Sequence, residues 1–479
     1  MQKSGTVKLL KTLSSKELKD FRKFINSPFH NNRKSVVKFF NILAKAAPEY
    51  DSPLILKEVI FKKLFGNKNY NDNLIRVNSH YLNELLEKFL AVNRFINNKI
   101  DYNLMLADEM ATREMYKQFD KNISVCLKLL DSEKPEGEIV LFQRFRIENS
   151  IMHRNSIESS GIYEKLKAPI VIDKVFSDLK KYFAYKTVIL FLQSKIIRGN
   201  YGTENVFADL ENSFNLLNID DYSDTPVILL YYYLAKMLSD ISNESYFYKV
   251  KELMSVYGKE FNLYDKTGVY VNLSNYCIRK VLDGFDKFDL ERFEIYKEEL
   301  KEKTYLNYDG TMSPVFYRNV TGLGLQLKEY EWTKNFIYEY KHELTAELRE
   351  NYSNFCLAQY EFQMKNFETS LELNSKLKHD ELYLKIYSKI LNIQNLYELK
   401  YFDTLDSSIE SFRHFISNNK LIPTDRKINF TNFFKCLNKI ISVQNKTDSD
   451  EISLLRIQLM KESAIAQKSW LVEKVNELS

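Results

Sequence analysis

One phrase recurs three times in the C-terminal part of the chain, and its spacing constrains the fold more than any other feature. The copies are LQLKEYEWTKNFI, FQMKNFETSLELN and YELKYFDTLDSSI, with aligned aromatic residues at Tyr330, Phe367 and Phe402. In each copy an apolar-patterned segment ends at a lysine, an aromatic residue follows, and a second amphipathic segment begins. The aromatic residues are 37 and 35 residues apart, and a looser copy has Phe288 another 42 residues earlier. A helix–turn–helix period of about 34 residues indicates stacked helical hairpins.

Glycine and proline are scarce, which argues against sheet-rich folds. The 479 residues include 12 Gly and 8 Pro, whereas average usage of roughly 7% and 5% would give about 34 and 24. These residue types supply most β-turns and strand ends, and Gly supplies backbone conformations with positive φ. We therefore expect few such conformations and an all-α fold, with helix over more than about 65% of the chain against a base rate near one third.

The repeated phrases also carry small residues where two helices of a hairpin would cross. The first copy has Thr321 and Thr333 around the turn, and the second has Ala358 and Ser370. The third copy has no cleanly placed small residues, and no copy has a proline after its second segment. Over residues 311–446 the chain resembles the tetratricopeptide (TPR) family, from which these two features depart. The resemblance implies an α-solenoid whose concave face, formed by the first helix of each hairpin, binds a peptide or a helix.

The expected organisation has three parts. Residues 1–100 form a small basic helical domain, residues 101–310 an irregular array of helical hairpins, and residues 311–479 the TPR-like repeats with a C-terminal helix. In the first part, Ser14 and Glu17 have the spacing of a capping box at the start of an amphipathic helix. The most linker-like segment of the chain is DSEKPEGE, residues 131–138.

The segment INSPFHNNRKS, residues 25–35, separates two helical patterns and is predicted to be a corner. Asn26 would take the left-handed conformation after the first helix, and Pro28 would prevent its continuation. Asn31 or Asn32 would cap the second helix through its side chain. Phe29 would fill the space between the two helices, which leaves only His30 without a structural role. The phrases FRKFINSPFHNN and LIRVNSHYLNELLEKFLA are similar to the opening of a family of uncharacterised bacterial proteins, a resemblance that implies no function.

Charge is distributed unevenly along the chain. Residues 1–100 contain 19 Lys and Arg but 8 Asp and Glu, whereas the whole chain has a net charge of +5. Such a basic segment is a candidate for binding phosphates, although Lys and Arg on the polar face of a helix often do no more than solvate it. The candidate nucleic-acid contacts are Arg22, Lys23, Arg33, Lys34, Lys62, Lys63 and Arg76.

Motifs for catalysis, metals or cofactors are lacking. His342 and Glu343 begin an HExxH pattern, but the second histidine is replaced by Ala346, and one imidazole cannot form that zinc site. Gly322 and Gly324 have no phosphate-loop context and are expected to allow close helix packing. The four cysteines are at least 79 residues apart, as expected for reduced thiols rather than a zinc knuckle. We expect no enzyme activity, no cofactor and no metal.

The apolar segments are too short for a membrane span. The most apolar one, PVILLYYYLAKML, carries Lys236 and is shorter than the roughly 20 residues that a bilayer requires. The N-terminal segment has five lysines in its first 19 residues and lacks the apolar core of a secretory signal. We therefore expect a cytoplasmic, non-enzymatic scaffold or adaptor for a protein partner. The alternative is a nucleic-acid-associated regulator whose basic N-terminal domain contacts phosphates.

Overall fold

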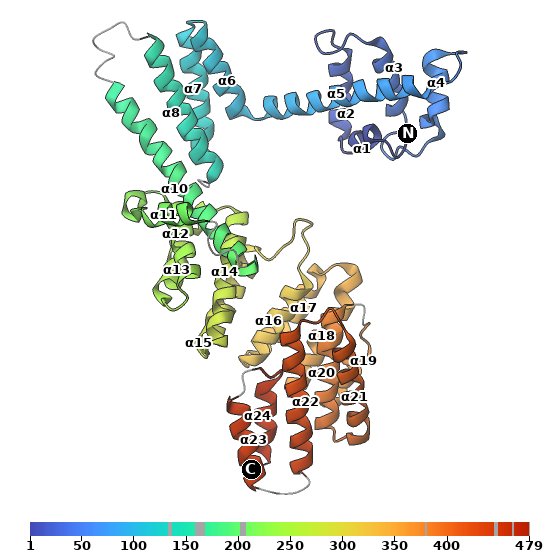
Figure 1. Cartoon of the computed structure of the whole chain (residues 1–479), viewed down its shortest axis with the longest axis vertical. Coiled ribbons are helices and arrows are strands. Elements are labelled where there is room, and N and C mark those ends of the chain that lie inside the picture. The colour runs from blue at the N-terminus through green and yellow to red at the C-terminus, as the bar shows by residue number, and fades with distance from the viewer. Residues whose placement is uncertain are drawn as a thin grey trace. The chain divides into compact units, whose positions relative to one another are not determined.

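The computed structural model is helical and divides into two compact units, Met1–Asn262 and Leu263–Ser479 (Figure 1). It describes residues 1–132, 137–158, 168–201, 207–378, 381–444, 449–461 and 464–478. Across these ranges the chain is 80% helical, with 23 α-helices. The described residues contain no strand, and their one β-bridge joins Leu306 to Met312. The predicted all-α fold is confirmed.

The first 97 residues form a helical head with its own core. Its α-helices are α1 (Gly5–Lys11), α2 (Ser15–Asn26), α3 (Lys34–Ala44), α4 (Lys57–Phe65) and α5 (Asp72–Asn97), with a 3-10 turn at Pro53–Ile55. The capping box is confirmed, because Ser14 and Glu17 each accept from the other's backbone N–H. Gly66 ends α4 with a φ of 67°. Apolar side chains from all five helices form one buried cluster that extends from Val7 to Phe89.

The rest of the first unit is a series of helices that pack on their sequence neighbours. They are α6 (Lys99–Thr112), α7 (Tyr116–Ser132), α8 (Glu138–Glu158), α10 (Ala168–Tyr201), α11 (Ala208–Asn215), α12 (Pro226–Ser239) and α13 (Glu244–Tyr257), with 3-10 turns at Ile219–Tyr222 and Gly258–Glu260. Half of the expected linker, residues 133–136, lies outside the described residues. The division at residues 100 and 310 stays a prediction. No helix within the described ranges is both long and apolar enough to cross a membrane.

The second unit consists of helical hairpins, and its helices from α15 onward share one hydrophobic core. Its helices are α14 (Leu263–Leu282), α15 (Lys287–Glu302), α16 (Pro314–Gln326), α17 (Tyr330–Tyr340), α18 (Ala346–Gln363), α19 (Phe367–Ser375), α20 (Leu382–Glu398), α21 (Phe402–Asn418), α22 (Thr424–Gln444), α23 (Ser449–Lys461) and α24 (Lys468–Glu477), with a 3-10 turn at Lys341–Glu343. Each hairpin packs its two helices together, and α18 and α20 each contact both helices of the hairpin before them. The structure is thus compatible with a helical-repeat fold.

The three repeated phrases form the same turn. Tyr330, Phe367 and Phe402 are the first residues of α17, α19 and α21. The lysine two positions earlier takes the left-handed conformation each time, with φ of 62° at Lys328, 62° at Lys365 and 60° at Lys400.

Hydrogen bonds close each of these turns as a Schellman motif. The N–H of the residue after the lysine donates to the carbonyl five residues earlier, from Glu329 to Gly324, Asn366 to Glu361 and Tyr401 to Leu396, each at 2.9 Å. Positive φ is rare among the described residues, as expected, and it occurs at seven non-glycine residues. Five of the seven are lysines or a glutamate at the C-terminal end of a helix, a position that often takes glycine.

The small residues at the predicted crossings are fully buried. Thr321, Thr333 and Ser370 are 0% exposed, as is Ala358. Close packing is confirmed at Gly324, where an added Cβ would lie 2.2 Å from the Thr333 hydroxyl on α17. The same prediction is wrong for Gly322, which has no atom within 4 Å of such a Cβ.

Two buried polar pairs connect α19 to α20. The Ser370 hydroxyl donates to the Ala358 carbonyl at 2.7 Å and accepts from the Asn395 side-chain amide at 2.9 Å. One turn along α19, the Asn374 amide donates to the Ser388 carbonyl at 3.0 Å, and the Ser388 hydroxyl donates back at 2.9 Å. Because a buried polar group is costly unless it is hydrogen-bonded, these pairs fix the register between the two helices.

Candidate functional site

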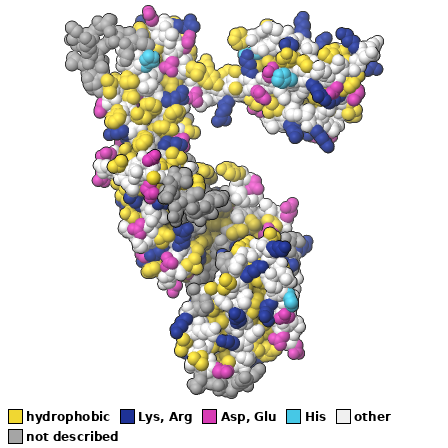
Figure 2. Space-filling view, viewed as in Figure 1, with side chains coloured by type: hydrophobic (Ala, Val, Ile, Leu, Met, Phe, Trp, Pro, Cys, Tyr) yellow, Lys and Arg dark blue, Asp and Glu magenta, His cyan; other side chains and the backbone are white. Residues whose placement is uncertain are grey.

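The seven candidate phosphate contacts are all exposed on the head. Arg22 and Lys23 lie on α2, Arg33 and Lys34 at the start of α3, Lys62 and Lys63 in the last turn of α4, and Arg76 on α5. On the face that Figure 2 shows, the Lys and Arg side chains are spread over the head. The structure gives no contact that joins the α4 lysines to the other candidates among the described residues.

Two of these cations already have carboxylate partners. Lys23 lies 2.9 Å from Asp20, and the Arg76 Nε lies 2.6 Å from Asp72. Asp72 also accepts from Lys57 at 2.7 Å. Hydrogen bonds, first of all the one from Lys57, lower the pKa of Asp72 to about 2. Lys23 and Arg76 are therefore less available to an incoming phosphate than the sequence suggested.

The two remaining arginines lie over aromatic rings. The Arg33 guanidinium is 3.6 Å from the centre of the Tyr81 ring on α5, and that of Arg22 is 5.9 Å from the Phe40 ring on α3. Both contacts leave the guanidinium exposed, and such stacking is a common arrangement for arginine. Lys34, Lys62 and Lys63 are in a different position, because within the described chain they form no ion pair and no ring contact. These three lysines are the cations most free to bind an anion.

The corner between α2 and α3 differs from its prediction in the roles of two adjacent residues. Phe29 is 86% exposed and fills no space between the helices. Instead, the His30 ring stacks on Phe24 of α2, with ring centres 3.9 Å apart and planes 13° apart. The backbone N–H of His30 donates to the Ser27 carbonyl at 3.0 Å. Phe29 is therefore a central residue of the turn whose side chain points away from the helices, whereas the His30 side chain packs against α2.

The asparagines of the corner also act differently. Asn26 ends α2 without a left-handed conformation, since Ser27 before Pro28 is extended, as the proline ring requires. Asn31 does not cap α3, which begins without a side-chain cap. Its amide donates to the Ile25 carbonyl at 2.9 Å, and its side-chain oxygen accepts from the backbone N–H two residues later. These two hydrogen bonds of Asn31 hold the corner together and leave the Phe29 side chain exposed.

A second candidate surface lies on the first helices of the repeats. The Arg318 guanidinium on α16 is 4.6 Å from the centre of the Tyr387 ring on α20, so two alternate first helices meet there. The Arg318 side chain also donates to Asn319 at 3.1 Å. Val315, three residues before Arg318, and Tyr383, four residues before Tyr387, are each 48% exposed. We call the surface of Val315, Arg318, Asn319, Tyr383 and Tyr387 the first-helix face.

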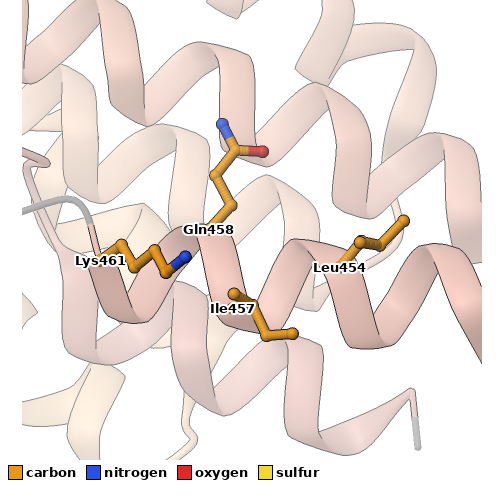
Figure 3. A pocket seen from close by; sticks show the side chains of 4 residues that line it. All are labelled: Leu454, Ile457, Gln458 and Lys461. Carbon is orange, nitrogen blue, oxygen red and sulfur yellow. The ribbon is translucent and has the colours of Figure 1, made fainter.

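A third candidate surface lies on the single helix α23. Leu454 and Ile457 are 66% and 52% exposed and line an open depression of about 440 Å³ with Gln458 and Lys461 (Figure 3). Gln458 is already engaged, because its side-chain oxygen accepts from Lys439 of α22 at 2.8 Å. The depression offers apolar contact area and no convergent polar groups.

Groups suited to catalysis or metal binding do not converge in the described part of the chain. No set of three or more His, Cys, Asp or Glu side chains there could hold a metal ion. The four cysteines are free and buried. Burial raises the thiol pKa of Cys126 to about 11 and that of Cys356 to about 12. These two thiols are protonated at neutral pH and are poor nucleophiles.

Glu299 and Lys474 are among the buried ionisable side chains that the sequence analysis missed. Glu299 on α15 is 5% exposed, and burial raises the pKa of its carboxyl to about 8. Lys474 on α24 is 4% exposed and lies 2.7 Å from Glu398 of α20, which also accepts from the Trp470 indole at 2.8 Å. Glu299 follows Tyr296 by one helical turn on an apolar face, and that position is the signal that would have identified it. The Lys474 ammonium stabilises the packing of α24 on α20 through its pair with Glu398.

Comparison of the chain with protein-family models, with curated proteins and with solved structures found no match. The candidate surfaces are therefore judged from the residues of this chain alone.

Proposed function

We propose that this chain is a non-enzymatic, cytoplasmic interaction scaffold with TPR-like repeats. It holds a peptide or a helix of a protein partner on the first-helix face. The four free, buried cysteines suit a reducing compartment. The repeated turn supports the repeat assignment, since it orients each pair of helices in the same way.

The observation that carries the proposal is the aromatic and basic surface between α16 and α20. Tyr and Arg are the residue types that contribute most to protein–protein interfaces, and Arg318 and Tyr387 are in contact here. Tyr383 and Val315 add half-exposed apolar area on either side of this contact. A partner segment laid across the two helices would bury all four side chains without breaking any hydrogen bond of the helices.

Site-specific photo-crosslinking tests this proposal. A photoreactive phenylalanine analogue replaces Tyr383 in one variant and the fully exposed Tyr308, in the loop before α16, in a control. We expect the first variant to capture a defined protein from nuclease-treated native cells, and the control to capture none. The purified partner should then bind at least about tenfold more weakly to Arg318→Ala/Tyr387→Ala, the loss typical of a central contact. Equal capture by both positions, or unchanged affinity of the double variant, would refute the proposal.

A second candidate function rests on the exposed corner of the head. Phe29 is 86% exposed and lies close in sequence to Arg33 and Lys34. An exposed aromatic ring among cations is the combination that binds single-stranded nucleic acid, by base stacking and by phosphate contacts. In this alternative the chain is a nucleic-acid-associated regulator.

Salt dependence separates the two candidates. If the head binds a single-stranded oligonucleotide through six or more phosphates, affinity should fall by roughly 10³-fold between 50 and 200 mM salt. Changing Lys34, Lys62 and Lys63 to Glu should weaken binding without unfolding the head, because these side chains make no ion pair with described residues. Phe29→Ala should weaken it at every salt concentration. We expect no measurable oligonucleotide binding even at about 50 mM salt, where phosphate contacts are strongest. Tight, salt-sensitive binding would favour the second candidate.

A further inference from the structure

A polar cavity of about 200 Å³ lies between α20 and α21, away from the first-helix face. Its lining residues are Lys389 and Asn392 on α20 and Thr404, Ser407, Ser408 and Ser411 on α21. The spacing of three residues on α20, and of three, four and seven residues on α21, places each set on one face of its helix. The cavity is several times larger than the roughly 30 Å³ that one water molecule occupies in the liquid.

The cavity carries positive charge that no described side chain neutralises. Lys389 is partly buried, and no described carboxylate lies within ion-pair distance of it. Burial, and then the charge of Lys385 one turn away, lower the pKa of the Lys389 ammonium. Lys385 itself lies over the Phe415 ring of α21 at 5.0 Å, so it also faces α21.

The acidic residues of α21 lie away from the cavity. Asp403, Asp406 and Glu410 are spaced by three and four residues and are not among the lining residues. Glu410 is engaged by Arg413 at 3.3 Å and by His414 at 3.1 Å. α21 therefore presents hydroxyl groups to the cavity and carboxylates elsewhere.

Most of the hydrogen-bonding groups of the cavity are available to a ligand. The Ser407 hydroxyl donates to the Asp403 carbonyl at 3.3 Å. The side chains of Thr404, Ser408, Ser411 and Asn392 make no hydrogen bond with another described residue. Thr404 also lies in the first turn of α21, where unpaired backbone N–H groups and the helix dipole favour an anion.

We propose that this cavity binds a phosphate group, either free or on a phosphorylated side chain. The Lys389 ammonium and the Asn392 amide approach the group from α20, and the hydroxyls of α21 approach it from the opposite side. Donors on two sides suit the tetrahedral oxygens of a phosphate better than the planar oxygens of a carboxylate. This site is independent of the first-helix face, because Lys389 faces α21 whereas Tyr387 contacts α16.

Titration of the full-length chain tests the site. The probes are inorganic phosphate, a phosphoserine tripeptide, its unphosphorylated form and acetate, and binding is followed by calorimetry and by ³¹P NMR. We expect saturable binding of at least one phosphorylated probe and none of acetate or of the unphosphorylated peptide. Binding of inorganic phosphate alone would identify free phosphate as the source, and binding of the phosphopeptide alone would identify a phosphorylated protein.

Matched variants locate the binding. Lys389→Met keeps the aliphatic stem but removes the charge, and it should weaken phosphate binding by roughly tenfold, the effect of one charge-assisted hydrogen bond. Ser408→Ala removes a single hydroxyl and should cause a smaller loss, which tests the cavity if Lys389→Met does not fold. Lys376→Met, on the exposed surface of α19, serves as the control and should leave binding unchanged. Three results would overturn the proposal. They are equal phosphate binding by the natural chain and both cavity variants, acetate binding as tight as phosphate binding, and the absence of saturable binding.

Discussion

Replacing the three turn lysines of the repeats with glycine should stabilise the second unit. Lys328, Lys365 and Lys400 have φ near +60°, a region in which an L-residue with a side chain is strained by about 1–2 kcal/mol. Glycine adopts this region without strain, but it also makes the unfolded chain more flexible, which costs roughly 0.5–1 kcal/mol. The net gain per site is therefore about 0.5–1 kcal/mol.

The three gains should add, because the lysines lie in different turns and share no contact. The triple variant is then expected to gain about 1.5–3 kcal/mol, which raises the melting temperature by roughly 5–10 °C for a unit of this size. Differential scanning calorimetry and guanidinium denaturation measure both quantities. No substituted lysine makes an ion pair with a described residue, so no such contact is lost.

Lys376→Gly is the control for this experiment. Lys376 caps α19 with a φ of −78° and pairs with Glu372 at 2.7 Å. Glycine relieves no strain there and should destabilise the unit by about 1 kcal/mol. If the triple variant melts at or below the temperature of the natural chain while the control behaves as expected, the strain argument is wrong.

Three further predictions concern single substitutions. Burial raises the pKa of the Glu299 carboxyl to about 8, against 4.5 in the unfolded chain, so its contribution to stability is complete below about pH 4.5 and is lost as the pH rises to 8. Glu299→Gln cannot ionise and should avoid up to ~4 kcal/mol of this loss. Urea denaturation at pH 6 and 9 measures the difference in unfolding free energy between the variant and the natural chain, which should be larger at pH 9. Gly324→Ala should cost about 1–3 kcal/mol, because its methyl group would collide with the Thr333 hydroxyl, and an unchanged melting temperature would contradict the close packing. At the corner, His30→Ala should cost about 1 kcal/mol of stability because the stack of its ring on Phe24 is lost, whereas Phe29→Ala should change stability by less than about 0.5 kcal/mol. The opposite order in thermal melts would show that Phe29, and not His30, packs on the helices.

The repeated turns were predictable because hydrophobic periodicity and the turn aromatic depend only on nearby residues. The pattern located the first residue of α17, α19 and α21 correctly. The left-handed lysines were not predictable from propensity, since Schellman turns usually take glycine and nothing in the sequence indicates that strain is tolerated. The scarcity of glycine therefore indicated the fold class correctly, but it did not indicate which residues would take the left-handed conformation at the helix ends.

The corner shows why the candidate sites were harder to predict. Hydrophobicity identified Phe29 as the buried residue, but the position within a turn decides which of two adjacent side chains faces the protein. In the same way, the sequence could not show that Arg76 is paired with Asp72 whereas Lys34 makes no ion pair with a described residue. The phosphate cavity required Lys389 and Ser408 to face each other across two helices, and that pairing depends on how α20 is rotated against α21.

The buried polar pairs between α19 and α20 have a consequence for how such a chain can evolve. The hairpin turns are alike, so local structure alone would allow copies to be duplicated, deleted or exchanged. With apolar residues in place of Asn395 and Ser388, the Ser370 hydroxyl would keep only its bond to the Ala358 carbonyl, and the buried side-chain oxygen of Asn374 would lose its partner, the Ser388 hydroxyl. A buried polar group left unpaired costs about 1–3 kcal/mol, a large part of the stability of an ordinary domain. We therefore expect a hairpin inserted between α19 and α20 to be tolerated only if it brings matching polar groups with it.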